Sequence, residues 1–232
     1  MSRISRIGLL AALAAIALLP LASFAAAPST GIGVLDFQTL TKNYVGTKAA
    51  NDCLQSLFQK LKSSLDVLQN GIGLNDDDFA TYQKLKAQPA QDKAQIDKFE
   101  AQAKAAVQEF QGLEAKVQGK ETLTAEQQAR YDILKKQILS ASARVNEQEQ
   151  QAQETMNTEV QRLQDIVKTE INNAVAKIAK DQKLSIVLNK NVQMEQGVEN
   201  VVVWNDQAMD VTDKVVKALN DNFKPELFDA KK

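Results

Sequence analysis

Residues 122–181 read TLTAEQQARYDILKKQILSASARVNEQEQQAQETMNTEVQRLQDIVKTEINNAVAKIAKD, a stretch without Gly or Pro. Because these two residues disfavour a helix most, the segment predicts one continuous helix. Its apolar residues recur from Leu134 to Ile178 every ~3.7 residues, with a polar interruption at Gln148, so the helix should be nearly straight. At 1.5 Å per residue it would be roughly 90 Å long. We therefore expect it to project from a body or to pair with another long helix.

Two earlier segments supply a partner for this helix, because their apolar residues alternate in steps of three and four. These residues are Leu54, Phe58, Leu61, Leu65 and Leu68 in the first segment and Ile96, Phe99, Ala103, Ala106, Phe110, Leu113 and Val117 in the second. A turn near Gly119 is predicted as the tip of an antiparallel hairpin, with Thr122 or Thr124 capping the returning helix. The outgoing arm is longer than the returning one, so a bulge or loop is expected around Asn70–Asp78.

Three aspartates, Asp76 to Asp78, lie at the end of this predicted joint. They lack the D-x-D-x-D-G spacing of a calcium loop. Carboxylates also favour the first turn of a helix, whose dipole is positive there. The sequence therefore predicts an acidic helix start, with a short helix over 79–88, and no metal site.

The first 25 residues have the pattern of a cleavable signal peptide. Arg3 and Arg6 precede an apolar run over 7–19 that is too short to span a bilayer. Small residues at Ser23 and Ala25 predict cleavage after Ala25. We therefore expect a soluble, exported mature chain with no stable membrane insertion.

Short strands are predicted at both ends of the mature chain. Ile32–Leu35 is the first, with Asp36 capping a helical turn. Leu184–Leu188 and Val198–Trp204 are expected to pair as a hairpin around a turn at 189–197. A closing helix starts at Asp210-Val211-Thr212-Asp213 with an Asp cap, and residues 225–232 are expected to be a flexible tail.

The two strand regions can share one sheet only if the residues between them extend away from the sheet and then return to it. The predicted fold is therefore mainly α with a small β body (α+β). A long antiparallel helical coiled-coil hairpin, 47–181, is inserted into a discontinuous β-rich body, 26–46 and 182–224. A body this small buries little, so we expect oligomerisation through it. The residues expected there are Val34, Ile186, Val202, Trp204 and Val216.

Composition argues against catalysis. The chain has no His, which removes the commonest general base and zinc ligand. Carboxylate pairs such as Glu147 and Glu149 lie in a Gln-rich, solvated helix with nothing apolar to shift a pKa. The phosphate-binding G-x-x-x-x-G-K-[ST] motif is absent. We predict no enzyme activity, no cofactor and no metal.

Charge and cysteine content limit the partners. There are 28 Lys and Arg against 29 Asp and Glu, and losing Arg3 and Arg6 with the leader lowers the net charge from −1 to −3. Nucleic acid, which requires a basic face, is therefore not an expected partner. Cys53 is the only cysteine, so no disulfide forms within one chain. It is either a small apolar helix residue or half of a disulfide between subunits.

The two ends of the mature chain resemble the Skp (OmpH) family of periplasmic chaperones. The resemblance rests on the signal peptide, the strand 32–36, the sequence INNAVAKIA at 171–179, the strand Leu184–Leu188 and the segment DVTD at 210–213. It implies a jellyfish-like homotrimer that holds unfolded outer-membrane β-barrel proteins in the periplasm, in a cavity between helical arms and without ATP. The best-known members are strongly basic, whereas this chain is slightly acidic.

A chaperone that holds unfolded chains needs many weak, adaptable apolar contacts. Most apolar arm residues are explained as the seam between the two helices. The residues predicted to contact a client are Phe79, Tyr82, Tyr131, Phe58 and Met156. The thin seam at 146–153, with Gln148 and Ala152, predicts a pliable arm.

Two other functions are consistent with part of this pattern. An envelope structural or adaptor protein could dock through its hairpin, but periplasmic adaptors of that type also need lipoyl-like and barrel domains, for which the chain has no room. A secreted hydrolase is disfavoured because the arrangements of nucleophile and base are missing.

Overall fold

The structure is a computed structural model, and it describes residues 31–88, 92–194, 197–200, 202 and 204–229; the side chains of 192–200 are not described. The predicted signal peptide lies outside these residues. The chain divides into two compact units. Unit 1 comprises the described residues up to Leu40 with Ala174–Val215, and unit 2 comprises Thr41–Asn173 with the described residues from Val216 onward.

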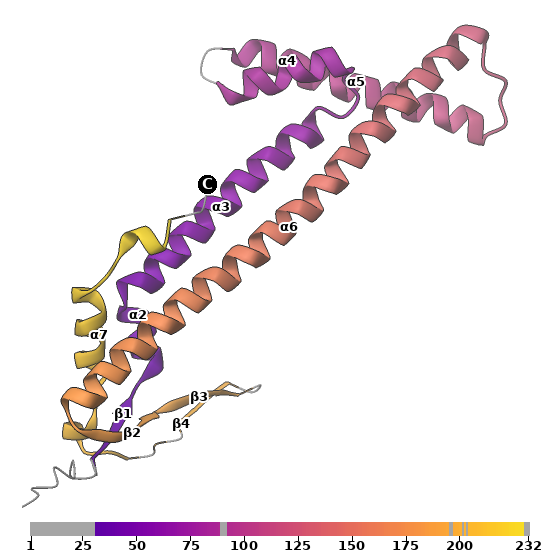
Figure 1. Cartoon of the computed structure of the whole chain (residues 1–232). Coiled ribbons are helices and arrows are strands. Elements are labelled where there is room, and N and C mark those ends of the chain that lie inside the picture. The colour runs from indigo at the N-terminus through magenta and orange to yellow at the C-terminus, as the bar shows by residue number, and fades with distance from the viewer. Residues whose placement is uncertain (1–30, 89–91, 195–196, 201, 203, 230–232) are drawn as a thin grey trace, which may run out of the picture. The chain divides into compact units, whose positions relative to one another are not determined.

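The described chain is mainly helical with little β-structure, as predicted (Figure 1). Its elements are β1 (Gly31–Leu35), α2 (Phe37–Asn43), α3 (Val45–Asn70), α4 (Asp76–Ala87), α5 (Lys93–Gln118), α6 (Ala125–Asp181), β2 (Leu184–Asn189), β3 (Asn191–Met194), β4 (Gly197–Asn200), η2 (Gln207–Met209), α7 (Thr212–Asp221) and η3 (Pro225–Leu227).

The unbroken helix predicted from residues 122–181 is present as α6. It starts after Thr124, one of the two caps proposed from the sequence. The Thr124 hydroxyl accepts a hydrogen bond from the Gln127 amide at 3.2 Å, and the Gln127 side chain accepts one from the Thr124 amide at 3.1 Å. This reciprocal pair satisfies two amide groups that the first helical turn would otherwise leave open.

In unit 1, β1 and β2 form a two-stranded parallel sheet, which confirms that the strands near residues 34 and 186 share one sheet. Gly33 allows close packing on one face, because a Cβ there would lie 2.7 Å from Leu184 Cδ1 and 3.6 Å from Val211 Cγ1. Parallel strands need a long crossover. Helices α2 to α6 lie between them in sequence.

The predicted hairpin between Leu184–Leu188 and Val198–Trp204 is wrong. The antiparallel hairpin is β3–β4, and β3 lies in the stretch expected to be a turn. Two asparagines explain the difference, because their side chains bond to the end of β1 instead of making a turn. Asn191 Nδ2 donates to Asp36 Oδ1 at 3.0 Å, and Asn189 Oδ1 accepts from the Phe37 amide at 3.3 Å.

Two aspartates cap helices in unit 1, as expected from the sequence. Asp36 Oδ1 accepts from the amides of Gln38 and Thr39, each at 3.0 Å. The Thr39 amide is the main reason why the pKa of Asp36 is lowered. Asp210 Oδ1 accepts from the Thr212 amide at 2.9 Å at the start of α7.

In unit 2, α3 and α6 run antiparallel side by side (Figure 1). Cys53 lies opposite Glu159, and Gln69 lies opposite Glu149. The first part of α6 instead packs against α5, with Arg130 bonded to Glu109 at 2.8 Å. Helix α6 therefore changes partner along its length.

The interruption predicted at Asn70–Asp78 is a tight turn followed by a second helical hairpin, α4–α5, rather than a loop in one continuous arm (Figure 1). This hairpin has its own core, composed of Leu74, Phe79, Tyr82, Ile96 and Ala103. The turn is tight because Gly71 lies under the Phe79 ring, and Gly73 has φ +101° against the Ala103 carbonyl. Asn75 caps α4 by accepting from the Asp78 amide at 2.8 Å.

The segment expected as a flexible tail is packed over residues 225–229; its last residues, 230–232, lie outside the described part. Phe228 is 4% exposed and packs with Ala50 and Leu163. Arg162 holds the segment by donating to the Leu227 carbonyl at 2.8 Å and to the Asp229 carbonyl at 3.1 Å. This packing could not be predicted from the local sequence, which is rich in charged residues, because the partners of the segment are more than sixty residues away along the chain.

Phe228→Ala should lower the free energy of unfolding by about 3 kcal/mol, since it empties a buried aromatic site. Urea denaturation followed by circular dichroism measures this. Lys224→Ala, on the exposed side of the same segment, is the control and should change stability by less than about 0.5 kcal/mol. Equal stability of the two variants would show that the segment does not pack against α3 and α6.

Gly73→Ala should destabilise unit 2 by at least about 1 kcal/mol, because a Cβ would impose strain at positive φ and would lie 2.8 Å from the Ala103 carbonyl. Gly112→Ala is the matched control. Apart from the neighbouring backbone of α5 itself, no atom lies within 4 Å of a Cβ at Gly112, so this change should stabilise by about 0.5–1 kcal/mol. Thermal unfolding of both variants distinguishes the two effects.

Candidate functional site

An apolar groove lies between α3 and α6 within unit 2. Its volume is about 340 Å³. The lining residues are Phe58, Leu61, Lys62, Leu65, Glu149, Ala152, Gln153, Met156 and Asn157. Two of the five residues predicted to contact a client, Phe58 and Met156, therefore meet in one place.

The sequence explains why a groove forms here. Helix α3 presents three large apolar residues at heptad spacing, Phe58, Leu61 and Leu65. The facing turns of α6 offer Ala152 and Gln153, which are too small or too polar to fill the space between them. Because the seam of α6 is thin at this point, the apolar side chains of α3 stay accessible to solvent: Phe58 is 53% exposed.

Polar contacts limit the groove at both ends. On one side, Gln69 Nε2 donates to Glu149 Oε1 at 3.3 Å. On the other, the Cys53 thiol donates to Glu159 Oε1 at 3.6 Å, and Arg162 pairs with Glu159 at 2.6 Å. The groove is thus a defined segment of the α3–α6 pair, with apolar walls between two polar bridges.

The thiol of Cys53 is poorly suited to chemistry. Burial raises its pKa, and the hydrogen bond to the Glu159 carboxylate acts in the same direction. A raised pKa lowers the thiolate fraction, and the thiolate is the reactive form. Within the chain, the Cys53 thiol serves as a hydrogen-bond donor from α3 to α6.

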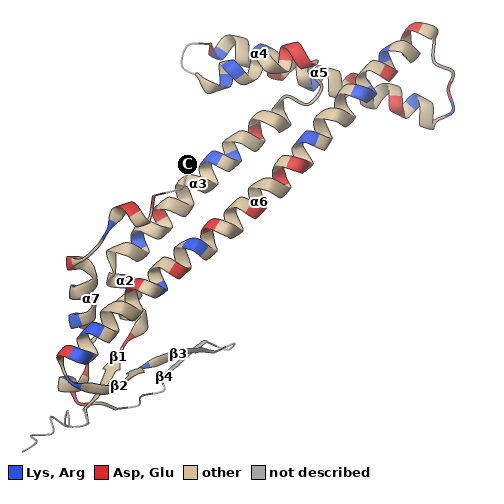
Figure 2. Cartoon of the chain, viewed as in Figure 1, with Lys and Arg blue, Asp and Glu red and all other residues tan. Residues whose placement is uncertain are grey.

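The middle of α6, which forms one wall of the groove, is acidic. From Glu147 to Glu159 the helix carries four glutamates and no Lys or Arg, as the red segments along its middle show (Figure 2). On α3, residues 54–66 carry Lys60, Lys62 and Asp66. Of these charged residues, Glu149 and Lys62 line the groove itself, one of each sign.

Three other residues predicted for client contact lie inside the chain. Phe79 and Tyr82 belong to the α4–α5 core, and Tyr131 packs between α5 and α6. Tyr82 is 0% exposed. In this conformation a client cannot reach these rings, which corrects their selection as contact residues.

Each of these rings is buried because it contacts a specific partner residue. Arg144 lies over the Phe79 ring at 5.1 Å, and the Tyr82 hydroxyl donates to Glu100 Oε1 at 2.8 Å. Tyr131 stacks on Phe110 with ring centroids 5.5 Å apart. Sequence spacing alone placed them off the main apolar stripes, but contacts from other helices cover them.

A second apolar surface belongs to unit 1, on one face of the β1–β2 sheet. Ile32 pairs with Ile186, and Val34 with Leu188, so the four side chains share that face. Ile186 is 52% exposed, and Ile32 and Leu188 are also exposed. Val34 on the same face is covered, with 2% exposure, so the uncovered apolar patch consists of Ile32, Ile186 and Leu188. Such an exposed patch is typical of a surface that packs against another chain.

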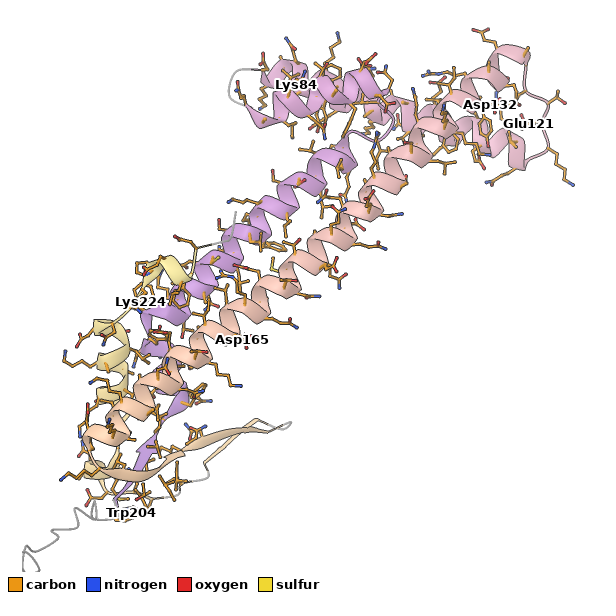
Figure 3. All side chains as sticks on the ribbon, in the orientation of Figure 1. Lys84, Glu121, Asp132, Asp165, Trp204 and Lys224 are labelled. Carbon is orange, nitrogen blue, oxygen red and sulfur yellow. The ribbon has the colours of Figure 1, made fainter. Side chains whose placement is uncertain are left out.

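The other residues expected in the β body differ from one another in exposure. Val34 is buried, while Val202 and Val216 are half-buried. Trp204, labelled in Figure 3, is 81% exposed. Sequence reasoning missed Ile32 and Leu188 on the sheet face; their alternation with Gly33 and Val187 is the signal that would have found them.

The described residues, 31–229 with short gaps, contain no cluster of three or more Cys, Asp or Glu placed to hold a metal ion. Among the same residues, no helix combines the length and the apolar character that crossing a bilayer requires.

Comparisons with known proteins agree with the sequence resemblance. A crystal structure of a candidate outer membrane chaperone (OmpH-like) from Caulobacter crescentus CB15 matches with a TM-score of 0.51 and 19% identity, covering 88% of this chain and 91% of that chain. At this identity the match shows a shared fold. A search of curated proteins finds no match. The model of the family described as outer membrane protein (OmpH-like) matches residues 77–219, more than half of the chain; the protein belongs to the OmpH-like family.

Proposed function

We propose that this protein is an ATP-independent holdase chaperone of the periplasm, which binds unfolded outer-membrane β-barrel proteins and prevents their aggregation. The observation that carries the proposal is the open apolar groove between α3 and α6 in a member of the OmpH-like family. The related structure from Caulobacter crescentus is also described as a candidate outer membrane chaperone.

The groove has properties that suit holding rather than folding or catalysis. Its walls combine an aromatic ring, Phe58, with a flexible thioether, Met156. Such side chains adapt to clients of different shape, so binding does not require one sequence. Each contact buries a small apolar area, and many weak contacts allow the client to be released without an energy source.

The client enters as an unfolded chain, before its apolar residues meet lipid. An outer-membrane strand alternates apolar and polar residues and aggregates in water when unpaired. Shielding its apolar side chains in several grooves at once would keep the chain soluble. Several copies of the groove require several chains.

We further propose that the chain forms a homotrimer through unit 1. The exposed face of β1–β2, with Ile32, Ile186 and Leu188, is the surface that a second copy would cover. We also propose that Trp204 is buried in the same assembly, because an exposed indole leaves a large apolar area in contact with water. The signal peptide expected over residues 1–25 would deliver the mature chain to the periplasm.

The double variant Phe58→Ala, Met156→Ala should weaken client affinity by roughly tenfold, because it removes the aromatic ring and the thioether that line the groove on its two walls. The assay is light scattering of an outer-membrane barrel protein diluted from urea, with stoichiometric mature chaperone. Ile133→Ala, Leu139→Ala is the matched control, because these residues are 51% and 60% exposed but lie outside the groove.

Equal suppression of aggregation by both double variants would show that the groove is not the client surface. No suppression by the unaltered protein would overturn the holdase function itself. Far-ultraviolet circular dichroism checks that both variants keep their helical content.

The double variant Ile186→Lys, Leu188→Lys should shift the protein from trimer to monomer in sedimentation velocity. Both side chains are exposed in the single chain, so the charges leave its own core intact and disfavour burial by a second copy. Ile133→Lys, Leu139→Lys serves as the control and should sediment like the unaltered protein. A monomeric unaltered protein would contradict the assembly.

A further inference from the structure

We infer that the α3–α6 groove receives an aromatic side chain of the client, and that Ala152 is the residue that gives it this specificity. The inference rests on the proposed holdase function and names the chemical class of side chain that the groove takes. It follows from a second place on the same helix pair, where a ring from another segment of the chain is bound beside a small residue.

At that second place the ring is Phe228, from the C-terminal segment. It packs with Ala50 of α3 and Leu163 of α6, and all three side chains are buried. Because the side chain of Ala50 is a single methyl group, α3 leaves room for a ring beside it. The α3–α6 pair therefore binds an aromatic side chain from a segment that belongs to neither helix.

The groove repeats this arrangement with the two helices exchanged. Here the small residue is Ala152 of α6, which is 8% exposed, and the large apolar residues are Phe58, Leu61 and Leu65 of α3. A cavity of about 150 Å³ is enough to bind benzene in an apolar protein core. The groove has a volume of about 340 Å³, so one aromatic side chain fits beside Ala152.

The walls of the groove favour a ring over an aliphatic side chain of similar size. The Phe58 ring is 53% exposed, and a pair of aromatic rings gains more than the area that it buries. The Met156 thioether adds a sulfur–aromatic contact. Charge does not select, because the charged residues that line the groove, Lys62 and Glu149, have opposite signs. A preference of about fivefold for Phe over Leu is therefore expected.

The groove also has polar groups that suit the main chain on either side of a bound ring. Gln153 and Asn157 line it, and a side-chain amide both donates and accepts hydrogen bonds whatever the sequence of the bound segment. Beside Phe228, Arg162 has the same role, since it donates to the carbonyl of Leu227 at 2.8 Å. The main chain of a client can thus be held while its ring enters the groove.

Ala152 determines the specificity because a larger residue at this position would occupy the space of the ring. Elsewhere on the apolar stripe of α6, Leu134 and Leu163 are 0% and 1% exposed, so leucine packs well on this helix. Ala152→Leu should therefore fill the groove from α6. It should raise the melting temperature by about 3 °C and weaken binding of an aromatic segment about tenfold.

The test uses the mature protein and two short, unstructured fluorescent peptides that differ only at one central position, with Phe in one and Leu in the other. Fluorescence anisotropy measures their affinities. The Phe peptide should bind about fivefold more tightly to the unaltered protein, and Ala152→Leu should reduce its affinity about tenfold. The matched control is Ala143→Leu, because Ala143 is exposed on the same helix and does not line the groove. This control should bind both peptides as the unaltered protein does.

A second measurement does not depend on how well the variant folds. A third peptide carries a photoreactive phenylalanine analogue at the central position, and mass spectrometry locates its crosslinks to the unaltered protein. These crosslinks should fall on residues that line the groove, above all Met156. Crosslinks confined to other parts of the chain, such as the α5–α6 turn near Gly119, would overturn the inference.

The outcomes separate this inference from the proposed function. If the Phe and Leu peptides bind equally, or neither binds, while aggregation of the barrel protein is suppressed, selection of a ring is wrong and the holdase function stands. If the Phe peptide is preferred and aggregation is not suppressed, the groove recognises a ring and the holdase function is wrong. An unchanged affinity for the Phe peptide in Ala152→Leu, or an equal loss in Ala143→Leu, would overturn the assignment of Ala152.

Discussion

The uninterrupted backbone of α6 is the constraint on which unit 2 depends. Over Ala125–Asn173 its apolar residues need partners, and no single segment supplies them all. Helix α5 covers Leu134, whereas α3 and the C-terminal segment cover Leu163. Between these two well-packed regions the seam of α6 is weak, and the groove occupies that place. A continuous helix with an uneven seam thus produces both a rigid support and a local apolar opening.

Local sequence signals predicted the elements well. The absence of Gly and Pro predicted α6, and side-chain chemistry predicted the caps at Thr124, Asp36 and Asp210, because each cap depends on amides within three residues of it. The pairing of β1 with β2 followed from topology, since two short strands so far apart in sequence need each other to form a sheet. Each of these features depends on only a few residues, so it could be predicted directly from the sequence.

Features that depend on distant contacts could not be predicted in the same way. The α4–α5 hairpin forms because Phe79 and Ala103 close around glycines in the turn, and spacing along one helix does not show this. Tyr131 was selected as an accessible ring, but Phe110 and Glu114 cover it from another helix. For the groove, the sequence indicated Phe58 and Met156 and the thin seam near Gln148. It did not show that Glu149 is bonded to Gln69 of α3, because such pairing depends on which helices meet.

The packing of Phe228 has a consequence for the order of events during biosynthesis. The α4–α5 core joins residues close in sequence, so it can form as soon as that part of the chain is available. The core around Ala50 and Leu163 needs a ring that is synthesised almost last. The packing of α3 against α6 around Ala50 and Leu163 therefore stays incomplete until nearly the whole polypeptide has left the ribosome. In a nascent chain that lacks its last ten residues, the α4–α5 hairpin would be folded and the core around Ala50 and Leu163 would be incomplete. Limited proteolysis would distinguish the two regions.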